Sequence, residues 1–203
     1  MEFEHAGLKV EINQDEDSQS PRLDDNLSRM VCFHSRYDLG DKDHEYDTKD
    51  YAGWDEMKAA IIRKEKTAFI LPLYLYDHSG LAISTGREYP FNCPWDSGQI
   101  GFVFVSKAAI RKEFGRKTTQ EHLERALKAM LAEVKLYDMY LQGDIWEYEV
   151  KDAEGEVLGS CYGYYGQEDC IADAKTAAEF CTKKQAEKIK DATGQLLFAF
   201  AKE

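Results

Sequence analysis

Residues that could carry out chemistry gather in a polar segment, residues 77–99, between two apolar runs of the chain. This segment contains His78, Cys93 and Asp96. A cysteine beside a histidine base, with a carboxylate to orient the ring, is the arrangement of a nucleophilic hydrolase or transferase. Asp-His-Ser-Gly and Cys-Pro-Trp-Asp-Ser-Gly are also typical of tight turns whose side chains bond to their own backbone. Two interpretations of this segment therefore stay open, a catalytic loop and a structural turn.

A second polar group lies upstream, where carboxylates recur along one segment: Asp38, Asp41, Asp43, Asp47 and Asp50. Calcium and magnesium prefer such ligands, but the pattern of a calcium-binding loop, with its central glycine and closing glutamate, does not match. The chain also lacks a glycine-rich phosphate loop, a dinucleotide-binding fingerprint and a paired-histidine zinc helix. We therefore predict no metal and no cofactor, and we interpret the five aspartates as a solvated loop that binds a partner.

The formal net charge is −12 and is unevenly distributed along the chain. Residues 1–56 contain 16 of the 38 acidic residues and 6 of the 26 basic ones, a net charge of −10. A negative surface repels phosphate backbones, so we expect no direct binding to nucleic acid. The same surface would attract a protein whose own nucleic-acid-binding surface is basic.

The polar segment lies between Phe69–Tyr76 and Ile100–Val105, whose β-branched and aromatic residues predict buried strands. Alternating apolar and charged residues over 144–166 predict a hairpin. The final apolar run, QLLFAFA (195–201), is interpreted as an edge strand.

Apolar residues at three- and four-residue steps predict helices over residues 54–66 and about 168–190. A short helix is predicted between Ser106 as its N-cap and Gly115 as its end, and a long one begins at a capping box formed by Thr118 and Glu121. Clustered strands with separate helices indicate an α+β fold, with a central, mainly antiparallel sheet packed by two long helices and shorter ones.

Residues 1–27 are predicted to be a mobile acidic arm, because they are mostly charged and polar, and residues 28–203 a single α+β domain. The N-terminus lacks the pattern of a signal peptide, and no apolar run reaches the roughly 20 residues of a membrane-spanning helix. Five cysteines without a Cys-x-x-Cys pair fit a reducing compartment. We therefore expect a cytoplasmic protein with no membrane partner.

Four segments carry a resemblance: CFHSRYDLGDKDH (32–44), LPLYLYDHSG (71–80), CPWDSGQIGFVFVSK (93–107) and CYGYYG (161–166). Over about residues 30–166 the chain resembles a family of small acidic proteins carried by bacteriophages and other mobile elements. The resemblance implies a mobile-element setting, and it carries over no activity and no catalytic residues. Small acidic proteins in that setting are often antagonists of host defence, such as anti-CRISPR or anti-restriction proteins.

The predicted function is that of a phage or mobile-element accessory protein in the host cytoplasm. It would bind and inhibit a nucleic-acid-handling host defence enzyme through its acidic surface. One alternative is a small hydrolase or transferase that uses the loop around His78 and Cys93. Another is an interaction or regulatory module without chemistry.

Overall fold

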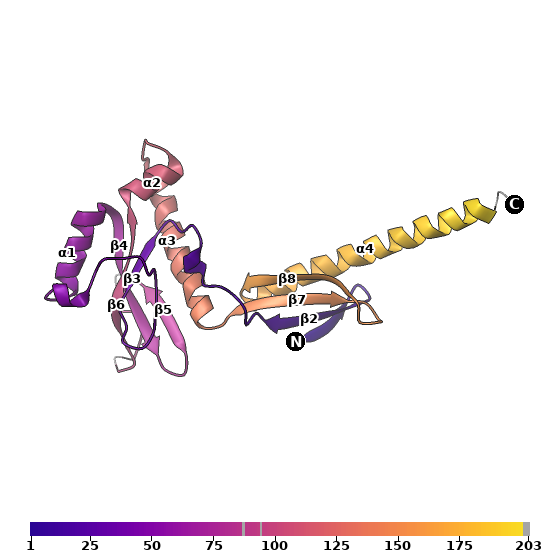
Figure 1. The fold of residues 1–203 in the computed structure, drawn as a ribbon, viewed down its shortest axis with the longest axis horizontal. Coiled ribbons are helices and arrows are strands. Elements are labelled where there is room, and N and C mark those ends of the chain that lie inside the picture. The colour runs from indigo at the N-terminus through magenta and orange to yellow at the C-terminus, as the bar shows by residue number, and fades with distance from the viewer. Residues whose placement is uncertain (87, 94, 201–203) are drawn as a thin grey trace. The chain divides into compact units, whose positions relative to one another are not determined.

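The chain folds into two compact units, each with its own four-stranded antiparallel sheet (Figure 1). The structure is a computed structural model that describes residues 1–86, 88–93 and 95–200, with the backbone alone for 191–200. Unit 1 comprises Met1–Ser18 and Gly143–Glu203, and unit 2 comprises Gln19–Gln142. The α+β class is therefore confirmed, although two sheets take the place of the one central sheet that we predicted.

Unit 1 consists of one sheet and one long helix. The strands run in the order β1-β2-β7-β8, all antiparallel. Their bounds are Glu2–His5 (β1), Leu8–Gln14 (β2), Ile145–Lys151 (β7) and Val157–Tyr165 (β8), and the helix α4 spans Gln167–Phe200. The predicted hairpin over 144–166 is β7 and β8, so that prediction is confirmed.

The core of unit 1 lies between this sheet and the first half of α4. Val10, Ile12 and Val150 are completely buried on the inner face of the sheet, where they meet Cys170 and Ala174 of the helix. Small residues on the helix let its backbone approach the strands closely. Beyond the strands α4 continues as a helix without a sheet beside it (Figure 1).

The N-terminal residues differ from the predicted mobile arm. Residues 2–14 form the hairpin of β1 and β2, and β2 pairs with β7 from Lys9↔Lys151 to Gln14↔Trp146. Strict alternation explains the pairing, because Leu8, Val10 and Ile12 point inward while the charged residues between them point outward. The polar composition of residues 13–27 obscured this short pattern.

The sheet of unit 2 has the order β3-β6-β4-β5. The two predicted apolar runs form its centre, where β4 (Thr67–Asp77) pairs antiparallel with β6 (Ser97–Ser106). The outer strands are β3 (Arg29–Cys32) and β5 (Leu81–Thr85). The segment rich in polar side chains therefore connects β4 to β6 by way of β5, at one end of the sheet.

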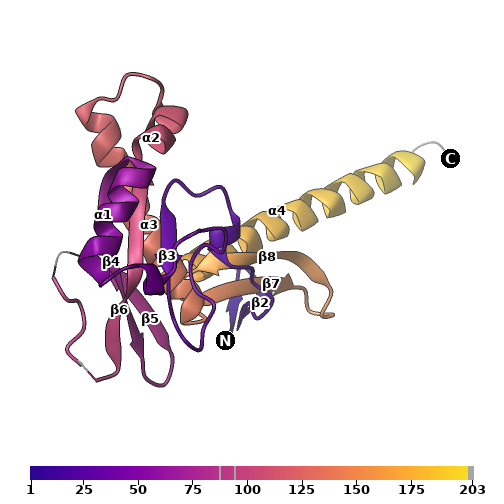
Figure 2. The same ribbon diagram turned by 60° about the vertical axis from the view of Figure 1, so that its left-hand side comes forward.

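Helices cover both faces of this sheet. Helix α1 (Trp54–Glu65) packs on one face and α3 (Gln120–Leu141) on the other, as Figures 1 and 2 both show. Helix α2 (Lys107–Phe114) connects β6 to α3, and two short 3-10 helices, η1 (Pro21–Leu23) and η2 (Thr48–Asp50), lie in the N-terminal part of the unit.

The ends of α2 and α3 can be compared with the capping residues predicted from the sequence. Ser106 caps α2 by accepting a hydrogen bond from the Ala109 N–H at 3.0 Å, and Gly115 ends that helix, as predicted. Helix α3 is capped by Thr119 rather than Thr118. The predicted edge strand over 195–201 is wrong, because α4 continues as a helix through Phe200, and residue 201 lies outside the described residues.

The N-terminal hairpin is open to a direct test of stability. Replacing Ile12, which is completely buried, by alanine should lower the free energy of unfolding by about 2–5 kcal/mol, because it removes buried methyl groups and leaves a cavity. Chemical denaturation measures the loss. The adjacent, exposed Asn13→Ala should change stability by less than about 0.5 kcal/mol. Equal, small effects of both substitutions would show that β2 is not part of the core.

Candidate functional site

The three predicted catalytic residues meet at one carboxylate. The Nδ1 atom of His78 lies 3.5 Å from the Asp96 Oδ2 atom, and the Cys93 thiol donates a hydrogen bond to the same oxygen at 3.4 Å. His78 comes from the β4–β5 turn, and Cys93 and Asp96 come from the segment that leads into β6. The long β4–β6 pairing holds these turns at the same end of the sheet, and the Asp77 N–H joins them by donating to the Asp96 carbonyl at 2.8 Å.

The turns bond extensively to themselves. The Ser97 hydroxyl donates to the Cys93 carbonyl and lies 2.6 Å from the Tyr89 hydroxyl. Ser79 has a φ of 59°, the left-handed conformation of a tight turn. These contacts give the polar residues a role in forming the turns. They favour the structural turn of the two interpretations made from the sequence.

The order of the groups differs from that of a cysteine hydrolase. In such an enzyme the thiol lies next to a histidine that takes its proton, and the carboxylate lies behind the histidine. Here the carboxylate of Asp96 lies between the thiol and the ring. Because nearby positive charge favours a thiolate, a carboxylate partner does not activate Cys93. Catalysis by this loop therefore stays a hypothesis that the geometry does not favour.

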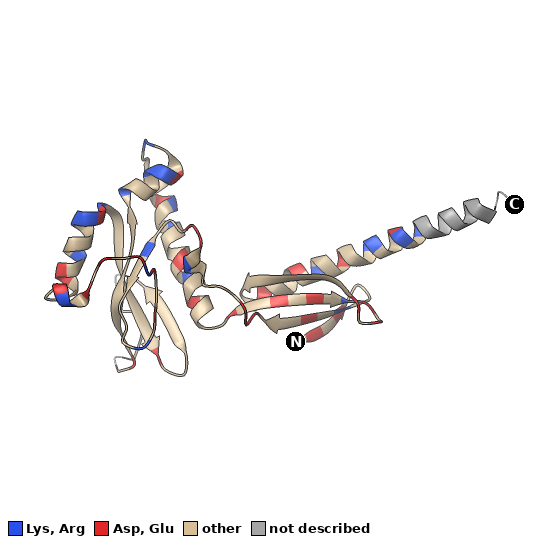
Figure 3. Ribbon diagram, in the orientation of Figure 1, with Lys and Arg blue, Asp and Glu red and all other residues tan. Residues whose placement is uncertain are grey.

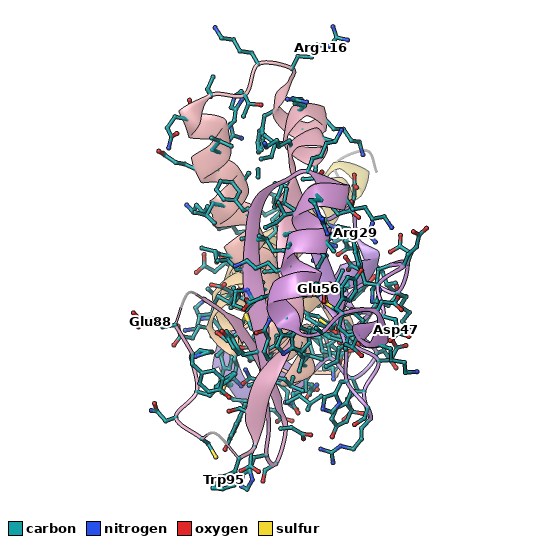
Figure 4. All side chains as sticks on the ribbon, turned by 90° about the vertical axis from the view of Figure 1, so that its left-hand side faces the viewer. Arg29, Asp47, Glu56, Glu88, Trp95 and Arg116 are labelled. Carbon is teal, nitrogen blue, oxygen red and sulfur yellow. The ribbon has the colours of Figure 1, made fainter. Side chains whose placement is uncertain are left out.

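Trp95 belongs to the same segment and is 92% exposed, at the end of unit 2 opposite Arg116 (Figure 4). A pocket of about 400 Å³ adjoins it, and Asp77 and Arg36 in its wall form an ion pair. An exposed tryptophan beside paired charges is a feature of a contact surface more than of a closed reaction chamber.

Asp41 departs most clearly from the predicted acidic surface, because its side chain is only 8% exposed. Its carboxylate accepts from the Arg22 guanidinium at 2.9 and 3.2 Å, from the Arg29 Nε at 3.2 Å and from the Met30 N–H at 2.9 Å. The side chain therefore holds the start of β3 to the segment that follows it. It is not available to a partner, and we remove it from the binding surface.

Arg22 extends this network to α3. Its side chain is 4% exposed and also donates to the Ser28 carbonyl at 2.7 Å. Glu133 of α3 lies 3.5 Å from Arg22 and accepts from the N–H groups of Leu27 and Ser28 at 2.8 and 3.0 Å. Residues 20–27, which were predicted to be part of a mobile arm, are thus held to the core of unit 2 by buried charged groups.

The other four predicted aspartates are exposed, but two of them have basic partners. Asp38 pairs with Lys42 at 2.7 Å and Asp43 with Arg29 at 2.7 Å. Asp47 accepts a hydrogen bond from the Lys49 N–H at 3.0 Å and so caps η2. The local negative charge of this loop is smaller than its composition suggests.

Charge is divided very unequally between the two units. Unit 1 has 19 acidic and 8 basic residues, a net charge of −11, whereas unit 2 has 19 and 18, a net charge of −1. Within unit 1, residues 1–18 and 143–181 contain 16 acidic and 3 basic residues, a net charge of −13. Seven of these acidic residues lie in the segments that flank β2 and β7 and carry −7, whereas the four strands and residues 167–181 of α4 carry −3 each.

Five of the acidic residues lie on the outer face of the unit 1 sheet, which we call the acidic face: Glu2, Glu4, Glu11, Glu147 and Glu149 (Figure 3). The register aligns them across three strands, since Glu2 is opposite Glu11 and Glu11 is opposite Glu149. Alternation in β2 and β7 sends their apolar neighbours to the core and these carboxylates outward. The alternation of apolar and charged residues in β2 and β7 is visible in the sequence, where it predicts the β7–β8 hairpin. It could also have predicted this charged face.

Two lysines neutralise one part of the acidic face. Lys151 lies 2.6 Å from Glu11 and 2.8 Å from Glu149, and Lys9 lies 2.7 Å from Glu11 and 3.1 Å from Glu2. Hydrogen bonds from Lys151 and Lys9 lower the pKa of Glu11 to about 2. Glu11 is therefore the paired centre of the face.

The other part of the face is not neutralised. Partial burial raises the pKa of Glu147, and the nearby carboxylates of Asp15, Glu149 and Asp17 raise it further. Among the described residues no lysine or arginine forms an ion pair with Glu147, Asp15 or Asp17. A concentration of uncompensated negative charge thus lies where β2 ends and β7 begins.

In the part of the chain that the structure describes, no three His, Cys, Asp or Glu side chains are grouped as a metal site would require. Similarly, no described helix is long and apolar enough to cross a membrane. Comparisons with known protein families, with curated proteins and with solved structures find no match for the chain. The acidic face therefore has to be interpreted from its own chemistry.

The buried network gives a prediction about unit 2. Replacing Arg22 by methionine should lower the free energy of unfolding by about 3 kcal/mol or more, because Asp41 and Glu133 would stay buried without their shared cation. Lys42→Met is the matched control. It removes an ion pair whose side chains are more than 70% exposed, so its cost should be below about 1 kcal/mol. Similar costs for both variants would contradict a structural role for the network.

The acidic face predicts a pH dependence of opposite sign at two glutamates. The raised pKa of Glu147 penalises the folded state at neutral pH, and the penalty disappears as pH falls towards the ordinary value of 4.5. The lowered pKa of Glu11 stabilises the folded state above pH 4.5, and this stabilisation is lost as pH falls towards 2.

Glu147→Gln should therefore raise the thermal midpoint at pH 7, and the gain should vanish near pH 4. Glu11→Gln should lower the midpoint at pH 7. Thermal unfolding followed by circular dichroism at both pH values checks the signs. Shifts of the same sign in both variants at pH 7 would contradict this assignment of paired and unpaired carboxylates.

Proposed function

We propose that the protein is a non-catalytic inhibitor whose acidic face occupies the basic, nucleic-acid-binding surface of another protein. The observation that carries the proposal is the charge of −13 within residues 1–18 and 143–181 of unit 1. The resemblance to acidic proteins of mobile elements supports a host defence enzyme in the host cytoplasm as the partner, in the manner of anti-CRISPR or anti-restriction proteins.

No other described element of unit 1 covers the acidic face, so the face is open to a partner. Helix α4 packs on the inner face of the sheet, and no described helix or strand of unit 1 lies on the outer face. Glu2 and Glu4 are exposed, and the side chain of Glu149 is 39% exposed. A flat sheet holds carboxylates in fixed positions, so a partner need not order them on binding.

The uncompensated end of the face supplies the attraction. Partial burial and the nearby carboxylates of Asp15, Glu149 and Asp17 disfavour the charged form of Glu147 in the free protein and raise its pKa. A lysine- or arginine-rich surface would relieve this repulsion and gain charge-assisted contacts. The same charge repels nucleic acid itself, so the protein would compete with nucleic acid for a partner rather than bind it.

The experiment removes four charges from each unit in turn. The first variant carries Glu4→Gln, Asp17→Asn, Glu147→Gln and Glu149→Gln, all in unit 1. Its control carries Asp38→Asn, Asp43→Asn, Asp47→Asn and Asp50→Asn, all in unit 2. Both variants have the same net charge, so a difference between them reports position and not total charge.

Wild-type protein immobilised on a resin should capture a nucleic-acid-binding protein from bacterial lysate, and duplex DNA should release it. The purified partner should then bind the unit 1 variant at least tenfold more weakly, and the unit 2 variant as well as wild type. Added salt should weaken the wild-type complex steeply, because exposed charges are screened over about 8 Å at physiological ionic strength. Equal binding by both variants, or capture that DNA does not reverse, would contradict the proposal.

A further inference from the structure

Unit 2 contains a cleft of about 950 Å³ that the acidic face does not involve. It lies between the segment that follows β3, the 3-10 helix η2 and the first residue of α1. Three aromatic rings in its wall come from Phe33, Tyr37 and Trp54, and two histidines, His34 and His44, lie beside them. This is the segment CFHSRYDLGDKDH, whose dense polar and aromatic content the proposed function leaves unexplained.

The segment is held firmly at both ends, so the cleft exists before any ligand arrives. The Phe33 N–H donates to the Ile100 carbonyl at 2.7 Å, and the Asp41 N–H donates to the Met30 carbonyl at 2.8 Å. Gly40 has a φ of 71°, and a Cβ atom there would lie 2.6 Å from the Met30 carbonyl oxygen. Only glycine allows the segment to return so closely to β3.

The rings form a wall suited to a planar ligand. Phe33 contacts His44 edge-on at 5.3 Å between centroids, and lies 6.3 Å from Trp54. His34 stacks on Tyr37 at 4.9 Å with an angle of 14° between the rings. Aromatic walls of this kind bind flat rings by stacking, and nucleobases stack on them whatever their sequence.

One lysine of the cleft is available to an anion. Asp41 in the wall is neutralised by Arg22 and Arg29, and Asp38 and Lys42 neutralise each other. Lys49 also lines the cleft, and among the described residues its Nζ atom has no ion-pair or hydrogen-bond partner. Its ammonium group can therefore pair with an anionic group of a ligand.

A histidine in the wall supplies an acceptor. The Nδ1 atom of His44 is buried and has no hydrogen-bond partner among the described residues. A buried polar atom without a partner is costly, and few persist in a folded protein without a reason. An amino group on a ring that lies against His44 and Phe33 would provide the missing donor after a small rotation of the imidazole.

From these three features we propose that the cleft binds a nucleoside 5′-monophosphate whose base carries an amino group. The base stacks on Phe33 with its edge towards Trp54, the amino group of the base donates to His44, and the phosphate of the nucleotide pairs with Lys49. The volume falls within the range of small-molecule sites, roughly 300–1,000 Å³.

Isothermal titration calorimetry of the full chain with three compounds tests each contact. AMP should bind. Adenosine, which lacks the phosphate, and purine riboside 5′-monophosphate, which lacks the amino group, should each bind about tenfold more weakly. Aromatic carboxylates such as indole-3-carboxylate test the other source of a flat anion, and they should bind more weakly than AMP because they lack the amino donor.

Lys49→Met should weaken AMP binding about tenfold and leave adenosine binding unchanged. Lys135 lies on the exposed face of α3, outside the cleft. Lys135→Met therefore controls for net charge, and it should leave the affinities for AMP and adenosine unchanged. Equal thermal midpoints would show that both variants are folded. Absence of AMP binding at millimolar concentration, equal affinity for AMP and purine riboside 5′-monophosphate, or no effect of Lys49→Met would overturn the proposal.

Discussion

The antiparallel pairing of β2 with β7 determines how the whole chain is organised. It joins residues 9–14 to residues 146–151, so the chain leaves unit 1 after its first strands, builds unit 2, and returns. The pairing also sets which face of the unit 1 sheet is charged, because a shift of β2 by one residue would turn Val10 and Ile12 to solvent and Glu11 to the core. Core packing in unit 1 thus maintains the acidic face.

Buried and exposed charge have different roles in the two units. In unit 2 nearly equal numbers of acidic and basic residues are present, and Arg22, Asp41 and Glu133 use buried charge to hold η1, β3 and α3 together. In the sheet of unit 1 two lysines pair with Glu2, Glu11 and Glu149, while no described lysine or arginine forms an ion pair with Glu4 or Glu147. The first arrangement stabilises a fold, and the second leaves negative charge that a basic partner can neutralise. We therefore propose that unit 1 binds the partner, through its negative charge.

Local patterns in the sequence predicted local structure well. The caps of α2, the pairing of β7 with β8 and the two central strands of unit 2 depend on neighbouring residues, and each was recognisable. The division into two units depends on contacts between residues more than 130 positions apart, which no local pattern contains. Likewise Asp41 resembled its exposed neighbours, because its partner Arg22 lies 19 residues earlier. The apolar run QLLFAFA favours a strand when it is considered alone, but α4 continues through it as far as Phe200 instead of ending near residue 190.

The central claim is that positive charge from a partner lies against the unneutralised end of the acidic face. The most direct measurement is the pKa of the Glu147 carboxyl by nuclear magnetic resonance, first in the free protein and then in the complex with the captured partner. We expect a raised pKa in the free protein, because of partial burial and the nearby carboxylates of Asp15, Glu149 and Asp17, and a lower pKa in the complex. A pKa that stays equally raised in the complex would contradict the account and place the contact elsewhere on the protein.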